Sequence, residues 1–239
     1  FVARGLKNAN VPVWTSLMLG FDKYSVENGE LQTETPEAIE AAKIYQRLMT
    51  KSAPPGVAGF NWAESQSAFL QGRIGMWFDG VGFAPPLEDP NKSRVVGKVG
   101  YGIMPKGPKA HASGTFGDGI GVTAASQKKE AAYLFCQWAV SPIMGARLLQ
   151  AGAGVPFRKS ILNDPKVREG VTMPSDWVDA VVGSGEISRL ALPVIIPVTE
   201  FRDVFGVALT NMISGSDPAG ELKKATEAFK PVLEKSEKA

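Results

Sequence analysis

One stretch of the chain decides the fold class, and it runs Phe69-Leu70-Gln71-Gly72-Arg73-Ile74-Gly75-Met76-Trp77-Phe78-Asp79. A helix is expected from near Asn61 to near Gly72, because an Asn favours a helix start and a Gly favours a helix end. The apolar run at residues 74–79 is then expected as a short strand. Short strands that alternate with helices predict an α/β fold.

Further helices are predicted from their caps and their apolar spacing. Thr35-Pro36 begins one, because Thr is a good N-cap and Pro fits the first helical position. A second is expected over residues 126–138. Ser141-Pro142 begins a third, which ends near Gly152.

The last part of the chain has the clearest helical pattern. We expect Thr199 to cap a helix that Gly215 closes, with one apolar stripe made of Phe201, Val204, Phe205, Ala208, Leu209, Met212 and Ile213. Asp217-Pro218 begins a final helix, which Pro231 is expected to kink or end. Two more strands are predicted at residues 99–104 and 119–123.

Composition excludes several classes of function. The chain has 239 residues, 26 Lys and Arg against 24 Asp and Glu, and a net charge of +2, so no basic surface points to nucleic acid. The single cysteine, Cys136, allows neither an internal disulfide nor a cysteine metal site and is expected as a buried thiol. No stretch of sequence is long and apolar enough to span a membrane.

The chain offers poor material for an enzyme. Its one histidine, His111, lies in a Gly/Pro/Lys loop, where we expect it to be solvated. There is no Gly-x-Ser-x-Gly elbow and no phosphate-binding Gly-x-x-x-x-Gly-Lys loop. The glycine-rich run at residues 114–121 has the wrong spacing for a dinucleotide loop. We therefore expect no catalysis, no cofactor and no metal.

Aromatic side chains near glycines favour carbohydrate binding. Sugars present apolar C–H faces and a rim of hydroxyl groups, so their sites combine flat aromatic rings with polar partners. Candidate rings are Trp14, Trp62, Trp77, Phe78, Phe83 and Phe116. Each ring taken alone is better explained as core. As a set, beside Asp79, Gly117, Asp118 and Arg158, they favour a sugar site.

Ordered motifs along the chain are similar to those of family 1 bacterial extracellular solute-binding proteins. The run at residues 60–76 resembles that family's helix ending in Phe-x-x-Gly-Lys/Arg-x-Ala-Met and the strand after it. Residues 99–108 resemble the next strand and its Pro-x-Gly-Pro turn. Residues 117–122 stand at the family's crossover, and the later segments at 126–139, 141–142, 152–160 and 215–218 keep the family's order.

This resemblance implies a type II periplasmic-binding-protein fold, with two α/β lobes that close on a ligand. Residues 1–115 and 161–239 are then expected in the C-terminal lobe. Residues 116–160 are expected to cross over and supply helices to the N-terminal lobe. Most of that first lobe lies before residue 1 in the family, so the crossover helices are expected to expose apolar faces.

The resemblance also implies the function and the partners. It predicts the substrate-binding component of a bacterial ABC importer, a monomer that carries a sugar to a permease in the inner membrane. Its location would be the periplasm, or the cell exterior on a lipid anchor. The alternatives to a sugar are a polyol, a phosphorylated polyol or a short oligosaccharide, and the alternative role is that of a chemosensory receptor. An enzyme on a similar scaffold is the less favoured alternative.

The resemblance assigns candidate ligand residues. Asp79 follows the strand where the family places a ligand contact, and Phe83 is expected as a stacking ring. Phe116, Gly117 and Asp118 fall at the crossover. Trp14 lies in an early loop where relatives carry cleft aromatics, and Arg158 is a further candidate. A Phe83→Ala variant is expected to weaken binding without unfolding the protein.

Overall fold

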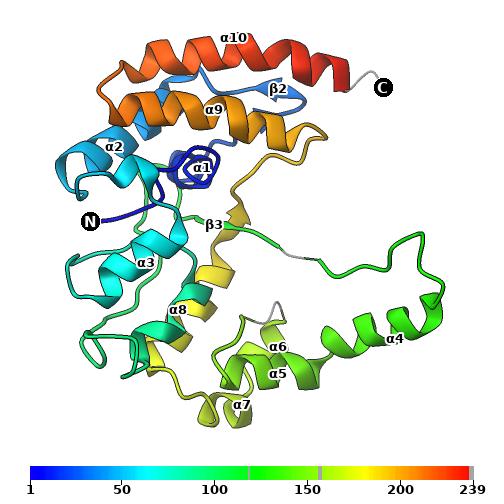
Figure 1. The fold of residues 1–239 in the computed structure, drawn as a ribbon. Helices are drawn as coiled ribbons and strands as arrows, with labels where there is room; N and C mark the ends of the chain where they lie inside the picture. The colour runs from blue at the N-terminus through cyan, green and yellow to red at the C-terminus, as the bar shows by residue number, and fades with distance from the viewer. Residues whose placement is uncertain (118, 156–157, 237–239) are drawn as a thin grey trace. The chain divides into compact units, whose positions relative to one another are not determined.

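The computed structural model describes residues 1–117, 119–155 and 158–236, and it divides the chain into two compact units (Figure 1). Unit 1 comprises Phe1–Asp79, Met104–Phe116 and Ile187–Ala239. Unit 2 comprises Gly80–Ile103 and Gly117–Glu186. The chain therefore passes between the units several times, which is the behaviour expected of a lobed α/β protein.

Most helices of unit 1 pack on one another around a shared core. In chain order they are α1 (Val11–Leu19), α2 (Pro36–Lys51), α3 (Trp62–Leu70), α9 (Val198–Ile213) and α10 (Pro218–Ser236), with a 3₁₀ turn at Val57–Gly59. Helix α9 lies along α10, and both contact α2, while α1 contacts α2 and α9 (Figure 1).

Aromatic rings form the centre of the unit 1 core. Phe201 and Phe205 lie with ring centroids 4.5 Å apart, Trp14 stacks on Phe205 at 5.6 Å, and Phe229 meets Phe201 edge-on at 5.4 Å. All four side chains are fully buried. The predicted stripe on α9 is confirmed, since Phe201, Phe205, Ala208, Leu209 and Met212 are its buried residues and Val204 and Ile213 pack against the same core.

Unit 1 contains short strands rather than a broad sheet. Strands β1 (Val26–Glu27) and β2 (Glu30–Leu31) form an antiparallel hairpin. Strands β3 (Ser113–Thr115) and β4 (Ser188–Leu190) pair in parallel, with Ser113 opposite Ser188. A single parallel bridge joins Val2 to Trp77.

The three strands predicted from sequence do not form in the described residues. Residues 74–79 contribute only the Val2–Trp77 bridge, and residues 99–104 and 119–123 contain no strand. A strand needs a neighbour to satisfy its backbone N–H and C=O groups, and local composition does not supply one. These predictions are therefore wrong for the described structure.

Most predicted helix starts are confirmed by their capping contacts. The Thr35 hydroxyl accepts a hydrogen bond from the Ala38 amide at 3.3 Å. Asn61 and Glu64 form a reciprocal capping box on α3. The Ser141 hydroxyl accepts from the Met144 amide at 3.3 Å at the start of α5 (Pro142–Gln150).

Two details of the C-terminal helices differ from expectation. Thr199 lies inside α9 rather than at its cap, because the helix already begins at Val198. Pro231 does not end α10, which continues to Ser236. Phe229 and Leu233 are buried on either side of Pro231, so core packing outweighs the one backbone hydrogen bond that the proline removes. Gly215 does close α9, in the left-handed region at φ 104°.

Unit 2 is helical and has a smaller core. It contains α4 (Lys129–Ala139), α5, α6 (Lys159–Leu162), α7 (Pro165–Glu169), α8 (Ser175–Glu186) and 3₁₀ turns at Val81–Phe83 and Pro85–Glu88. Trp177 of α8 is buried, and its indole N–H donates to the Val81 carbonyl at 3.0 Å. The Tyr101 hydroxyl donates to Glu88 at 2.8 Å, and the Tyr101 amide donates to Asp176 at 2.9 Å. These contacts attach the 80–103 segment to α8.

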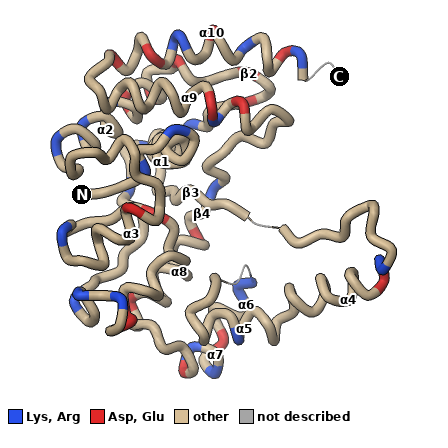
Figure 2. Tube along the Cα trace, viewed as in Figure 1, with Lys and Arg blue, Asp and Glu red and all other residues tan. Residues whose placement is uncertain are grey.

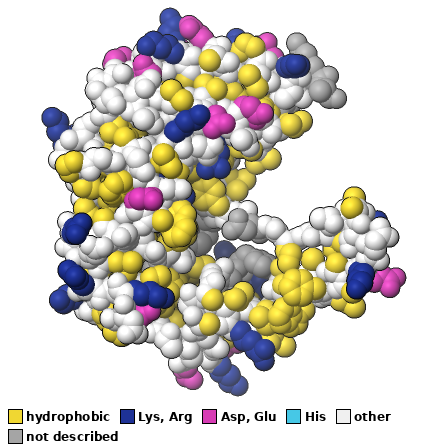
Figure 3. All heavy atoms as spheres, in the orientation of Figure 1, with side chains coloured by type: hydrophobic (Ala, Val, Ile, Leu, Met, Phe, Trp, Pro, Cys, Tyr) yellow, Lys and Arg dark blue, Asp and Glu magenta, His cyan; other side chains and the backbone are white. Residues whose placement is uncertain are grey.

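Helix α4 exposes large apolar side chains. Leu134 is 63% exposed and Trp138 is 52% exposed, and Tyr133 and Phe135 are exposed on the same helix. Val140, just after α4, and Ile143 of α5 are exposed as well. Charge lies only at the first turn of α4, and hydrophobic atoms gather along the rest (Figures 2 and 3). The expected exposure of a crossover helix is therefore found. Cys136 is half-buried on this helix, not buried as predicted.

The unit boundaries differ from the predicted lobe boundaries. Residues 80–103 and 161–186, expected in the C-terminal lobe, belong to unit 2. The physical reason lies in contacts such as those of Trp177 with Val81 and of Asp176 with Tyr101, which join the 80–103 segment to α8. The assignment of the units to the two lobes of a binding protein stays a prediction.

Candidate ligand-binding surface

An ion pair with little exposure lies at the start of unit 1. The Arg4 guanidinium donates from Nε to both carboxylate oxygens of Asp79, at 3.1 and 2.9 Å, and Nη2 adds a third hydrogen bond. The Asp79 side chain is 5% exposed and that of Arg4 is 22% exposed. Bidentate hydrogen bonds between an arginine and a carboxylate are among the stronger charge-assisted hydrogen bonds in proteins.

Backbone pairing explains why Arg4 meets Asp79. The Val2 amide donates to the Met76 carbonyl at 2.8 Å, and the Phe78 amide donates to the Val2 carbonyl at 3.0 Å. This parallel bridge sets Val2 opposite Trp77. Arg4 and Asp79 each lie two residues further along, so they share one side of the pair.

A second guanidinium belongs to the same cluster. Arg202, in the first turns of α9, donates from Nε to the Asn8 carbonyl at 3.3 Å. Burial lowers the pKa of Arg202, the positive charge of Arg4 lowers it further, and the charge of Asp203 acts in the opposite direction. Asp203 itself accepts from the Asn8 side chain at 3.0 Å and lies 3.8 Å from the Lys7 ammonium.

The loop before α1 is fastened tightly to α9. Asn10 is fully buried, and its amide donates to the carbonyls of Gly5 and Gly206 and to the Thr210 hydroxyl. Asn8 takes a positive φ of 73°, a conformation that Asn tolerates better than most residues. Gly206 has no side chain, which allows the Asn8 backbone to lie directly against the helix. The charged cluster is therefore built on a rigid support.

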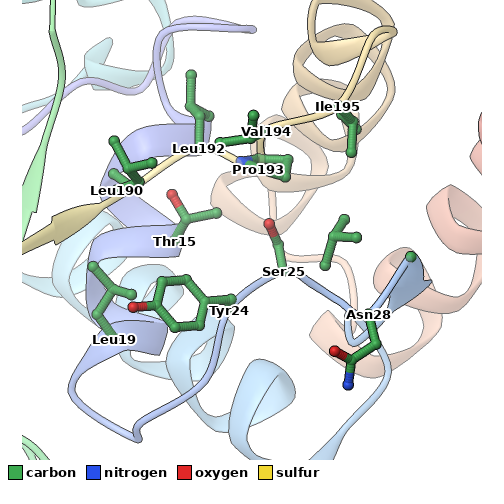
Figure 4. Close-up of a pocket in the computed structure, with 13 residues that line it drawn as sticks. Thr15, Leu19, Tyr24, Ser25, Asn28, Leu190, Leu192, Pro193, Val194 and Ile195 are labelled. Atoms are coloured by element: carbon green, nitrogen blue, oxygen red, sulfur yellow. The ribbon is translucent and has the colours of Figure 1, made fainter.

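A separate cavity of about 510 Å³ also lies within unit 1 (Figure 4). One wall is the apolar segment from Leu190 to Ile195, and the other carries the polar side chains of Tyr24, Ser25 and Asn28 with Thr15. Its volume falls within the range of small-molecule sites, and its lining is both polar and apolar. Among the described residues, none of those predicted from sequence to contact ligand lines this cavity.

A family model described as bacterial extracellular solute-binding protein matches residues 4–146 of the chain. The chain belongs to this family. Its fold is that of the two-lobe periplasmic binding proteins, of which these residues form a part.

Three relatives illustrate the similarity. An ABC transporter solute-binding protein from Agrobacterium radiobacter, solved in complex with ribitol, matches with a TM-score of 0.84 and 29% identity, covering 97% of this chain and 59% of that one. A probable amino-acid ABC transporter periplasmic-binding protein of Sinorhizobium fredii is 30% identical over 129 residues, 54% of this chain and 28% of the relative. The mannitol-binding protein of Pseudomonas aeruginosa is 23% identical over 154 residues, 64% of this chain and 33% of the relative. The chain thus spans only part of the length of each.

Unit 1 of this solute-binding chain holds three of the predicted site residues. Asp79 lies in the charged cluster, paired with Arg4. Phe116 follows β3 and is 55% exposed, so its ring is available to a partner. Trp14 is a correction, because its ring is fully buried, stacks on Phe205 and donates from Nε1 to the Ala38 carbonyl at 3.1 Å. A ring without exposure cannot touch a ligand.

The other predicted residues belong to unit 2 or lie outside the described residues. Phe83 is half-buried at the end of a 3₁₀ turn, Gly117 is exposed, and Arg158 is exposed with weak contacts of 3.5 Å to the Val140 carbonyl. Asp118 lies outside the residues that the structure describes. His111, exposed as expected, contacts the Met104 carbonyl at 2.8 Å.

Sequence reasoning missed Arg4 and Arg202 in this solute-binding chain. Arg4 stands in the first residues, where no cap or periodic pattern marks it. Arg202 looks like an ordinary polar position between the buried Phe201 and Phe205. Only the Val2–Trp77 bridge and the packing of residues 5–10 on α9 bring the two guanidinium groups together.

Proposed function

We propose that the chain is the substrate-binding component of a bacterial ABC importer and that its ligand is a sugar or a polyol. The observation that supports this best is the match of 97% of the chain, at 29% identity, to a ribitol-bound solute-binding protein of such a transporter. The mannitol-binding relative points to the same chemical class. Family and structural neighbours are solute-binding proteins rather than enzymes.

The proposal includes a partner and a location. A solute-binding protein of this kind delivers its ligand to a membrane permease, here as a monomer in the periplasm or at the cell exterior. The family and the periplasmic relatives support this location. Within the described residues, no helix has the length and apolar character needed to cross a membrane. Use of the same fold by a chemosensory receptor is the alternative role.

We place the ligand against the charged cluster rather than in the cavity lined by Tyr24 and Leu190. Arg4 and Arg202 supply guanidinium N–H donors of the kind that bind hydroxyl groups, and Asp79, which is 5% exposed, holds Arg4 in place. Phe116 supplies an exposed ring of the kind that packs on a sugar's C–H face. Phe83, Gly117, Asp118 and Arg158 remain predicted contacts from unit 2 and its border.

A thermal-shift scan with ribitol, mannitol, other sugars and amino acids tests the function. A ligand present at a hundred times its dissociation constant stabilises the folded state by about 2.7 kcal/mol, so a binding solute should raise the melting temperature visibly. We expect the rise with polyols or sugars and none with amino acids. A rise only with amino acids would contradict the proposed ligand class.

Phe116→Ala tests where the ligand lies. Because this ring is more than half exposed, its loss should leave the melting temperature of the free protein unchanged. Affinity for the best polyol or sugar should fall about tenfold, in line with an aromatic contact of roughly 1–1.5 kcal/mol. Tyr24→Ala is the matched control, because Tyr24 is 40% exposed and lines the cavity instead. A larger loss in Tyr24→Ala would move the site to the cavity.

A further inference from the structure

Two buried residues with hydroxyl groups line the cavity of unit 1. Thr15 is 2% exposed and Ser25 is 4% exposed. The Thr15 hydroxyl donates its proton to the Val11 carbonyl at 3.1 Å, so its oxygen is left as an acceptor. The Ser25 hydroxyl has no hydrogen-bond partner among the described residues. Figure 4 shows its oxygen pointing toward the segment of Pro193 and Val194, across the cavity.

The wall that faces these hydroxyl groups is apolar. It is the segment from Leu190 to Ile195, in which Val194 is 84% exposed. Among the described residues that line the cavity, none carries a charge. A charged ligand would therefore lose hydration there without a compensating partner. A polyol would hold several of its hydroxyl groups against the apolar wall, and each polar group left unpaired costs free energy.

We propose that this cavity is a second binding site, which takes a neutral aliphatic molecule with a single hydroxyl group. A ligand hydroxyl both donates and accepts, so it can donate to the Thr15 oxygen or pair with the Ser25 hydroxyl in either direction. Its alkyl chain lies against the apolar wall, where each methylene removed from water stabilises the complex. The cavity volume of about 510 Å³ is ample for such a molecule. The inference does not rest on the solute placed at the charged cluster.

Titration calorimetry on the full-length protein tests the ligand class, with n-butanol, n-pentanol, n-hexanol, hexanoate and ribitol as probes. We expect saturable binding of the alcohols, about fourfold tighter for each methylene added. Hexanoate has an apolar chain like that of n-hexanol but carries a charge, so it should bind about tenfold more weakly or less. Ribitol should not displace n-hexanol.

Ser25→Ala tests the polar contact. The variant should weaken n-hexanol binding about two- to tenfold, the loss expected for one neutral hydrogen bond. Because the Ser25 hydroxyl has no partner among the described residues, the melting temperature of the free protein should not fall. That second measurement separates a lost ligand contact from a damaged fold.

Val194→Ala and Ile196→Ala separate binding in the cavity from general adsorption of alcohol. Both side chains are apolar and belong to the same exposed segment, at 84% and 78% exposure, but of the two only Val194 lines the cavity. Val194→Ala should weaken n-hexanol binding about threefold, because it removes two methyl groups from the wall. Ile196→Ala is the matched control and should leave the affinity unchanged.

Four results would overturn the inference. Heats that do not saturate, or equal losses in Val194→Ala and Ile196→Ala, would show adsorption to exposed apolar side chains. Unchanged n-hexanol affinity in Ser25→Ala would show that this hydroxyl is only hydrated. Hexanoate binding as tight as that of n-hexanol would contradict the neutral ligand class. Displacement of n-hexanol by ribitol would make the cavity the polyol site, while the proposed solute-binding function would stand.

Discussion

Replacing Asp79 by alanine is expected to destabilise unit 1 by about 3 kcal/mol, because removal of one partner from a buried pair leaves the other charge uncompensated. Asp79 is 5% exposed and accepts three hydrogen bonds from Arg4. The loss would appear as a lower midpoint in urea unfolding with an unchanged slope.

An exposed ion pair in the same unit provides the control. Asp22 pairs with Arg189 at the surface, with 60% of the Asp22 side chain exposed. Asp22→Ala should leave the unfolding midpoint close to that of the parent, since solvent screens such pairs. Equal losses in the two variants would mean that burial of the Arg4–Asp79 pair does not strengthen it.

Gly206→Ala is expected to destabilise the protein by about 2 kcal/mol, as for other substitutions that overfill a packed site. A Cβ atom at this position would overlap the backbone nitrogen of Asn8, and backbone cannot move aside as a flexible side chain can. The destabilisation caused by the clash must exceed the roughly 1 kcal/mol by which alanine stabilises a helix relative to glycine. Thermal or urea unfolding measures the result.

Gly185→Ala is the control that separates the higher helix propensity of alanine from the steric clash at position 206. Gly185 also lies in a helix, α8, but a Cβ there would meet no heavy atom within 4 Å. That variant should be neutral or slightly more stable. A Gly206→Ala protein as stable as the parent would show that residues 5–10 do not pack on α9 as described.

Local signals in the sequence predicted helices α2, α3, α4, α5, α9 and α10, whereas α1, α6, α7 and α8 were not predicted. The N-caps at Thr35, Asn61 and Ser141 were predictable because a cap bonds to an amide only two or three residues away. The stripe on α9 was predictable because helical period alone sets which residues share a face. The N-cap of α9 is Pro197, two residues before the predicted Thr199. Pro231 does not end α10, because its neighbours Phe229 and Leu233 are buried in the core.

Features that depend on distant partners were not predictable in the same way. The strand segments at 99–104 and 119–123 have suitable residues but no pairing neighbour in the described structure. Trp14 looked like a cleft aromatic because its burial depends on α9, almost 200 residues further along the chain.

In the candidate site too, the sequence predicted single residues but not their distant partners. Asp79 was named from the resemblance to the family, and the structure adds its partner Arg4, which lies 75 residues away in sequence. Arg202 depends on an even longer separation, of 194 residues, to its contact Asn8. Phe116, named from the resemblance as a ligand contact, is 55% exposed, and its role in binding stays a prediction.

The most direct test of the account is amide hydrogen exchange with and without the solute that gives the largest thermal shift. Exchange reports local opening, which a bound ligand suppresses where it makes contact. The account predicts slower exchange in residues 1–10, 76–83 and 198–206, which carry the charged cluster and its support. The account would be contradicted by protection confined to the cavity-lining residues 24–29 and 190–195. It would also be contradicted if no sugar or polyol slowed exchange anywhere.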